Sequence, residues 1–180
     1  MHSRRKKRVE KEEQLKEECF VKRWIAGTLI AAGGTAAYAV VKNQQMPADV
    51  GRPGGPLAPV PSTPNAVSSL ADDDHYIEPF PMQGDEQESI RTLRRVLRRM
   101  PECRLMTVTD WYIHAVFHSK TMRYKDDVEF LINKDAGHID VRSAARMGYS
   151  DMGVNRKRID RLRGEYIAES LPDPSAGRDI

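Results

Sequence analysis

Acidic and basic side chains gather in residues 126–156, beside a predicted turn between a strand and a helix. The residues concerned are Asp126, Asp127, Arg142, Arg146, Ser150, Asp151, Asn155 and Arg156. Arginine binds a carboxylate through two parallel hydrogen bonds, and such pairs satisfy buried polar groups where the backbone turns irregularly. One interpretation is therefore a structural network of Arg–carboxylate pairs around this corner.

A second interpretation of the same residues is a small anion-binding site. Backbone N–H groups at the start of the last predicted helix favour negative charge. Arg142, Arg146 and Arg156 would add positive charge around that helix end. A phosphate or a carboxylate would suit such a site, and the sequence leaves both interpretations open.

Spacings typical of catalytic or metal centres are missing from the sequence. The histidines that could serve are His75, His114, His118 and His138, and no pair of them has zinc-site spacing with a nearby cysteine. Ser143 and Ser150 lack the Gly-x-Ser-x-Gly context of a hydrolase. We therefore expect no catalytic residues, no metal and no cofactor, and a protein that is not an enzyme.

The elements that would position these residues follow from hydrophobic periodicity. An apolar stripe at helical spacing predicts a helix over residues 89–100, which Pro101 ends. Alternation of apolar and polar residues predicts strands at 104–109, 111–119, 128–133 and 138–143, and a helical pattern follows from about 153 to 169. Short connections favour antiparallel pairing. The expected fold class is α+β, with a small antiparallel sheet of about four strands and two packed helices.

An uncharged stretch, Trp24 to Val41, predicts one transmembrane helix ahead of this domain. Small residues four apart, Gly27 with Ala31 and Gly33 with Ala37, favour close packing against other helices in a membrane. Two alternatives remain: a buried soluble helix, and a cleaved signal peptide, because Ala37-Tyr38-Ala39 resembles a cleavage site.

Charge predicts the orientation of this segment. Residues 1–23 hold nine Lys/Arg and five Asp/Glu, within a chain whose net charge is +3. Such an excess keeps the N-terminus on the cytoplasmic, matrix or stromal side, so the folded domain would lie on the opposite side. Cys19 and Cys103 then fall in different compartments, and we expect no disulfide between them.

The chain divides into five predicted segments. They are a charged arm (1–23), a transmembrane helix (24–41), a Pro/Gly-rich tether (42–71), the globular α+β domain (72–170) and a flexible tail (171–180).

One long motif within the domain, VRSAARMGYSDMGVNRKRIDRLR, accompanies DDVEF and the earlier stretch PSTPNAVSS. Over Leu57 to Arg163 the chain resembles the family named domain of unknown function 1499. Members of that family often carry cysteines in the proline-rich entry, where this chain has Val60 and Ala66. The resemblance implies a shared domain and no established chemistry.

These observations favour a non-catalytic, single-pass accessory or stabilising subunit of a larger membrane protein complex. Energy-converting membranes, namely the bacterial inner membrane, the mitochondrial inner membrane and the thylakoid, are the natural hosts. The expected partners are other membrane-protein subunits and membrane lipid, and no nucleic acid. The alternative is a membrane-anchored module that binds a lipid, a pigment or a small anionic ligand.

Overall fold

The structure is a computed structural model that describes residues 34, 37–119 and 123–170. The chain separates into two units between Lys42 and Asn43, and residues 37–44 are helical. Among the described residues, no helix is both long and apolar enough to cross a bilayer. Most of the predicted span, with its packing residues Gly27, Ala31 and Gly33, lies outside the described residues, whereas Ala37 belongs to the helix over 37–44.

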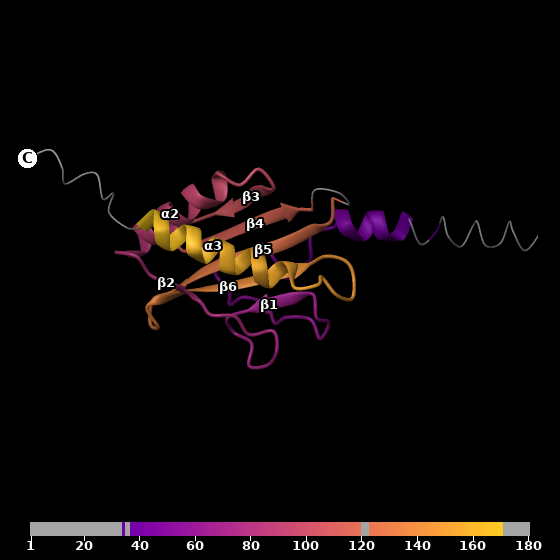
Figure 1. Cartoon of the computed structure of the whole chain (residues 1–180), viewed down its shortest axis with the longest axis horizontal. Helices are drawn as coiled ribbons and strands as arrows, with labels where there is room; N and C mark the ends of the chain where they lie inside the picture. The colour runs from indigo at the N-terminus through magenta and orange to yellow at the C-terminus, as the bar shows by residue number, and fades with distance from the viewer. Residues whose placement is uncertain (1–33, 35–36, 120–122, 171–180) are drawn as a thin grey trace, which may run out of the picture. The chain divides into compact units, whose positions relative to one another are not determined.

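The second unit is an antiparallel sheet with helices on one face (Figure 1). Its strands are β1 (Ala66–Ser68), β2 (Phe80–Pro81), β3 (Cys103–Val108), β4 (Tyr112–His118), β5 (Lys125–Asn133) and β6 (His138–Ala145). Its helices are α2 (Glu86–Arg98) and α3 (Val154–Ser170). The strand order is β1-β6-β5-β4-β3, and β2 also pairs with β6. The α+β prediction is confirmed.

The sheet has six strands rather than about four. The two additional strands, β1 and β2, have three and two residues, too few for alternation to reveal them. Strand β1 falls within the range predicted as a tether. The β5–β6 hairpin turns at Gly137, whose φ of +67° suits a residue without a side chain.

One face of the sheet carries the apolar core. Alternate residues of β4, β5 and β6 point toward α2 and α3, because side chains in a strand alternate between the two faces. Phe130 of β5 lies edge-on to Phe80, with ring centroids 5.3 Å apart, and Phe80 also contacts the ring of Tyr166 from α3. All three rings are fully buried, so this face is held by apolar packing.

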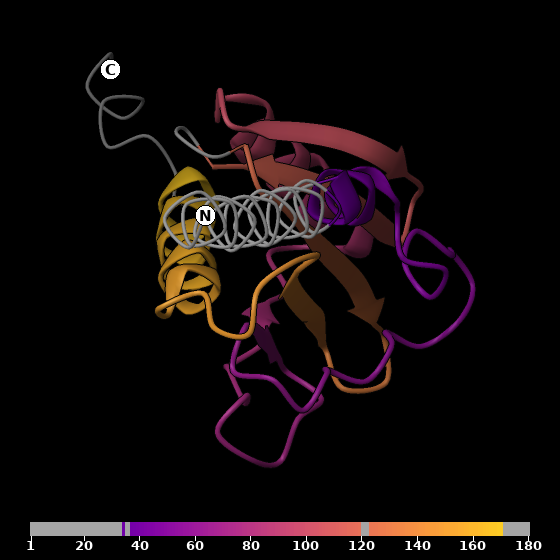
Figure 2. The ribbon, with the colours of Figure 1, turned by 90° about the vertical axis from the view of Figure 1, so that its right-hand side faces the viewer.

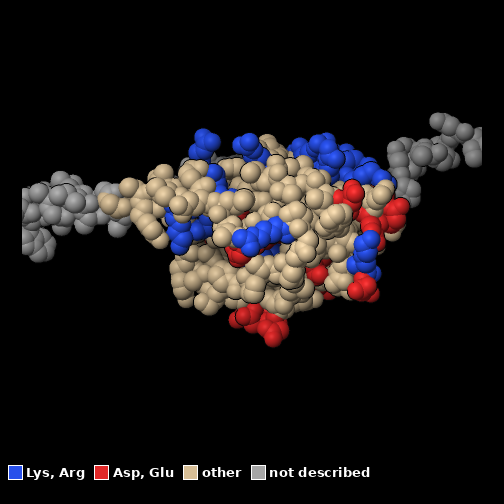
Figure 3. Space-filling model, turned by 180° about the vertical axis from the view of Figure 1, so that it is seen from behind, with Lys and Arg blue, Asp and Glu red and all other residues tan. Residues whose placement is uncertain are grey.

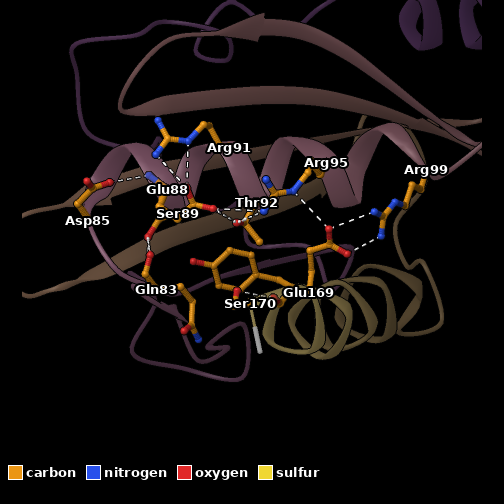
Figure 4. A network of polar contacts seen from close by, with 11 residues as sticks. Gln83, Asp85, Glu88, Ser89, Arg91, Thr92, Arg95, Arg99, Glu169 and Ser170 are labelled. Atoms are coloured by element: carbon orange, nitrogen blue, oxygen red, sulfur yellow. Dashed lines mark hydrogen bonds and ion pairs between the residues drawn. The ribbon is translucent and has the colours of Figure 1, made fainter. Parts of the chain in front are cut away.

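Polar contacts on the outside of this core join α2 to α3 (Figure 4). Asp85 caps α2 by accepting a hydrogen bond from the N–H of Glu88. Glu169 of α3 forms ion pairs with Arg95 and Arg99 of α2. Ion pairs of such exposed arginines add little to stability, typically less than about 1 kcal/mol each.

The opposite face of the sheet is covered by residues 43–60, hereafter the strap. Figure 2 shows the strap and α3 on opposite sides of the sheet. Val50 and Leu57 of the strap are buried, and Asn43 is 8 % exposed. The side chain of Asn43 donates to the carbonyl of Arg123 and accepts from the N–H of Lys125. This part of the predicted tether is thus packed on the domain.

Candidate functional site

A buried layer of charged and polar side chains lies between the sheet and the strap. It arises because the strand residues that alternate with the core point away from the helices. Its members, hereafter the ionic layer, are Tyr112, His114, Asp127, Glu129, Arg142 and Arg146. Buried charges are costly unless they are paired, so the pairing within this layer decides what it can do.

Asp127 is the centre of the first group. Arg146 donates two hydrogen bonds to its carboxylate, at 2.7 and 2.8 Å, and His114 Nε2 lies 2.9 Å from Oδ1. Because a carboxylate only accepts, Nε2 carries the proton. Burial alone would raise the pKa of Asp127, but the hydrogen bonds and charges of Arg146 and His114 outweigh it and lower that pKa.

Glu129 is the centre of the second group. The hydroxyl of Tyr112 donates to Glu129 Oε1 at 2.5 Å, and Arg142 donates to Oε2 at 3.4 Å. Burial, followed by the hydrogen bond to the Glu129 carboxylate, raises the pKa of Tyr112. The phenol therefore stays protonated and serves as a donor.

The strap closes over both groups at Gly51. Its N–H lies 3.0 Å from the Tyr112 hydroxyl and 3.3 Å from Glu129 Oε1. Gly51 has a φ of +76°, and a Cβ at this position would lie 3.2 Å from His114 Nδ1. A residue with a Cβ would be strained at this φ and would require His114 or the strap to shift slightly. Among the described residues, His114 Nδ1 has no hydrogen-bond partner.

A separate polar cluster lies on the helix side of the sheet. Asn155 of α3 accepts hydrogen bonds from Ser143 and from Arg158, and donates to the carbonyl of Asn65. Arg158 also donates to Asp126 at 2.5 Å. Burial raises the pKa of Asp126, against the opposing charge of Arg158. This cluster joins α3, β1 and the sheet.

The predicted corner residues are therefore divided between two faces of the sheet. Asp126 and Asn155 lie on the helix side, and Asp127, Arg142 and Arg146 lie in the ionic layer. Asp126 and Asp127 point in opposite directions because they are consecutive in one strand. The eight residues do not meet at one place.

Three further predicted residues act on nearby backbone. The carboxylate of Asp151 accepts from the N–H groups of Gly153 and Asn155 and so caps the start of α3. Ser150 accepts from the N–H of Met152. Arg156 donates to the carbonyls of Asp74 and Tyr76, which anchors the loop before β2 to α3.

Sequence reasoning missed several members of these clusters. Tyr112, His114 and Glu129 lie on the same face of the sheet as Asp127 and Arg142. The alternation of side chains along each strand could have predicted this shared face. Arg158 lies one helical turn after Asn155, which is the spacing of neighbours on a helix surface. Asn65 had no comparable signal, because it enters this cluster through its backbone carbonyl, while its side chain donates to the carbonyl of Gly148.

Within the part of the chain that the structure describes, no group of three His, Cys, Asp or Glu could hold a metal ion. Burial raises the pKa of Cys103 to about 12, so this thiol is protonated at neutral pH and is a poor nucleophile.

Residues 56–165 match the family described as protein of unknown function (DUF1499). The chain belongs to this family. The matched range includes every strand of the sheet, α2 and most of α3, and it confirms the resemblance read from the sequence. The ionic layer and the helix-side cluster of this DUF1499 domain both lie within that range. The comparison with curated proteins finds no match.

Proposed function

We propose that this DUF1499 protein is a non-catalytic, single-pass accessory subunit of a larger membrane protein complex. The observation that carries the proposal is the attachment of the strap at Asn43. One residue, Lys42, separates the predicted span, Trp24 to Val41, from Asn43. The side chain of Asn43 donates to the carbonyl of Arg123 and accepts from the N–H of Lys125, so the folded domain begins directly after Lys42.

A short connection suits a fixed subunit better than a mobile capture domain. A free linker of thirty residues would let the domain reach roughly 30 Å from its anchor. The strap instead contributes the carbonyls of Asn43 and Gln44 to Arg146 and the carbonyl of Pro59 to Arg142. These contacts fix the strap on the sheet, so residues 43–60 do not act as a free linker.

The ionic layer supports a structural role. Its carboxylates pair with arginines of the same layer, and the strap covers them. An enzyme site needs acid or base groups that a substrate reaches. We propose that the layer fastens the strap to the sheet. We also propose that the domain lies on the side of an energy-converting membrane opposite the charged N-terminus.

Sizing in mild detergent tests the proposal. Native membranes that contain the full chain are solubilised, and the chain is located by blue native electrophoresis. We expect it to migrate with a complex much larger than its own 20.4 kDa. Migration as a free monomer in every mild detergent would contradict the accessory-subunit role.

A length variant tests the short connection separately. Twelve Gly/Ser residues inserted between Lys42 and Asn43 should weaken association with the complex, because the domain is no longer held near its neighbours. The matched control carries the same insertion in the exposed loop before α3, between Tyr149 and Ser150. Equal retention of both variants in the complex would show that the short connection is irrelevant.

A second candidate, a module that binds a small anionic ligand, is favoured by one hollow on the surface. It measures about 310 Å³ and is lined by Lys157, Arg158 and Arg161 of α3, with Phe117 behind them. Arg158 and Arg161 already pair with Asp126 and Glu102, which reduces the charge available to a ligand. Native mass spectrometry of the chain purified from its membrane should show a bound small molecule, and consistently empty protein would argue against it.

A further inference from the structure

Strand β3 is the outer strand of the sheet on the side away from β1. Its only strand partner among the described residues is β4, so its other edge faces no strand. Its exposed side chains are Arg104, Met106 and Val108, and Trp111 follows in the turn to β4. Met106 is 49 % exposed and Trp111 is 45 % exposed, so with Val108 they place three large apolar side chains along one edge of the sheet.

Helix α2 packs beside this strand and adds positive charge. Glu88 and Glu169 form ion pairs with three arginines of α2, which are Arg91, Arg95 and Arg99 (Figure 4). Arg94 and Arg98 lie one turn apart, are exposed, and pair with no acid in the described part of the chain. Figure 3 shows Lys and Arg gathered along the edge of the molecule where α2 and β3 lie.

The type of cation points to a protein partner. Residues 86–104 contain six arginines and no lysine. Protein interfaces are enriched in Arg, Met and Trp and depleted in Lys. Arginine is favoured over lysine because its guanidinium binds a carboxylate through two parallel hydrogen bonds. An anionic lipid surface attracts lysine as well as arginine. The exposed arginines Arg94, Arg98 and Arg104 therefore fit carboxylates of a protein better than lipid headgroups.

A hollow at the far end of β3 adds an apolar element. It measures about 540 Å³, and Trp111, Leu131 and Ile132 form its apolar wall. Asn133, Lys134, Asp135 and Asp140 complete it with Pro56 and Leu70. An apolar wall with polar groups around it suits an apolar side chain of a partner.

The irregular pairing of β3 indicates how a partner would lie. The register between β3 and β4 shifts between Leu105 and Thr107, which places a bulge at Met106. Bulges and charged side chains at a sheet edge oppose the addition of another strand. A partner would therefore contact the exposed side chains rather than extend the sheet.

We propose that the β3 edge and the adjoining side of α2 dock an acidic segment of a partner subunit. Carboxylates of that segment bind Arg94, Arg98 and Arg104, and an apolar side chain enters the hollow beside Trp111. The proposal rests on the accessory-subunit role and names the surface through which the folded domain carries it out.

Site-specific crosslinking in the native membrane tests this surface. A photoreactive amino acid replaces Met106 in the full chain, and the control replaces Tyr149, which is 75 % exposed in the loop before α3. We expect Met106 to crosslink to one segment rich in Asp and Glu in another protein of the complex, and Tyr149 not to reach it. Crosslinks only to lipid, only to a second copy of this chain, or to nothing would overturn the proposal.

Charge-reversed variants sharpen the test. Arg98→Glu should reduce the crosslink yield on the order of tenfold, because a carboxylate now faces the acidic segment. Lys157→Glu reverses one exposed charge on α3 and should leave the yield within about twofold. Circular dichroism confirms that both variants fold. Equal losses in the two variants would overturn the proposal.

Electrophoresis of the unmodified chain separates the two hypotheses. If the chain migrates with the complex but Met106 yields no acidic crosslink, only this docking surface is wrong. If the chain migrates alone, the accessory role is wrong and the docking surface falls with it.

Discussion

The two faces of the sheet are buried by different means. The helix face is packed with apolar side chains such as Phe80, Phe130 and Tyr166, whereas the strap face holds paired charges under a Pro/Gly-rich segment. Apolar packing is non-directional and tolerates adjustment. A buried ionic layer requires each donor and acceptor to be in place. The strap face therefore specifies where residues 43–60 lie more than it adds net stability.

The same contrast appears in two consecutive residues. Asp126 lies on the helix side and Asp127 on the strap side, and their carboxyl pKa values are shifted in opposite directions. Burial dominates at Asp126, although Arg158 opposes it, whereas the partners Arg146 and His114 dominate at Asp127. One strand thus carries two carboxylates whose environments differ because of what covers each face.

The largest expected effect comes from the helix face. Phe130→Ala removes a fully buried ring that contacts Phe80, and we expect a loss of about 3–5 kcal/mol in the free energy of unfolding. Urea denaturation followed by circular dichroism measures it. A loss below about 1 kcal/mol would mean that this face is loosely packed.

Breaking an ion pair on the strap face should cost nearly as much. Arg146→Met leaves Asp127 buried without its arginine, and we expect a loss of about 3–5 kcal/mol. The double variant Asp127→Leu with Arg146→Met should be more stable than Arg146→Met alone, because no unpaired carboxylate remains. The exposed control, Arg91→Met, should cost less than about 1 kcal/mol. A double variant that is the least stable of the three would contradict this view of the layer.

The strap contact at Gly51 should produce a smaller effect. Gly51→Ala introduces a residue at positive φ and places its Cβ against His114, so we expect a loss of about 1–2 kcal/mol from strain plus the cost of crowding. Gly153→Ala has the same φ of +76° without any neighbour within 4 Å. The difference between the two variants, measured by urea denaturation, isolates the crowding. No difference would indicate that the strap lies farther from the sheet.

The smallest expected effects concern the pH dependence of stability, which should distinguish Asp126 from Asp127. The lowered pKa of Asp127 gives stability that is present above its ordinary value of 3.8 and lost as the pH falls through the lowered pKa. The raised pKa of Asp126 acts oppositely, since its contribution grows as the pH falls through the raised pKa. Relative to neutral pH, Asp127→Asn should therefore lose less stability in acid than the parent chain, and Asp126→Asn should lose more. Denaturation series from pH 7 to pH 3 measure both, and identical series would refute the assignment.

Sequence alone determined the α+β class, the four long strands, both packed helices and the family. Apolar residues alternate along β4 at Ile113, Ala115 and Phe117, and such a pattern depends only on neighbouring residues. A strand or helix long enough to repeat its apolar pattern can therefore be predicted from sequence. Strands β1 and β2 are shorter than one repeat, so their pairing with β6 became visible only in the tertiary structure.

Tertiary structure alone decided which polar residues meet. The sequence grouped Asp126 with Asp127 and Arg142 with Arg156 because they are close along the chain. The fold pairs Asp127 with Arg146 and Asp126 with Arg158, since a strand sends consecutive side chains to opposite faces. It also turns residues 43–60 from a predicted tether into a cover, because the carbonyls of Asn43 and Pro59 and the N–H of Gly51 meet charges that come from distant strands. Pairing between segments far apart in sequence has no local signature, so only the folded chain could reveal it.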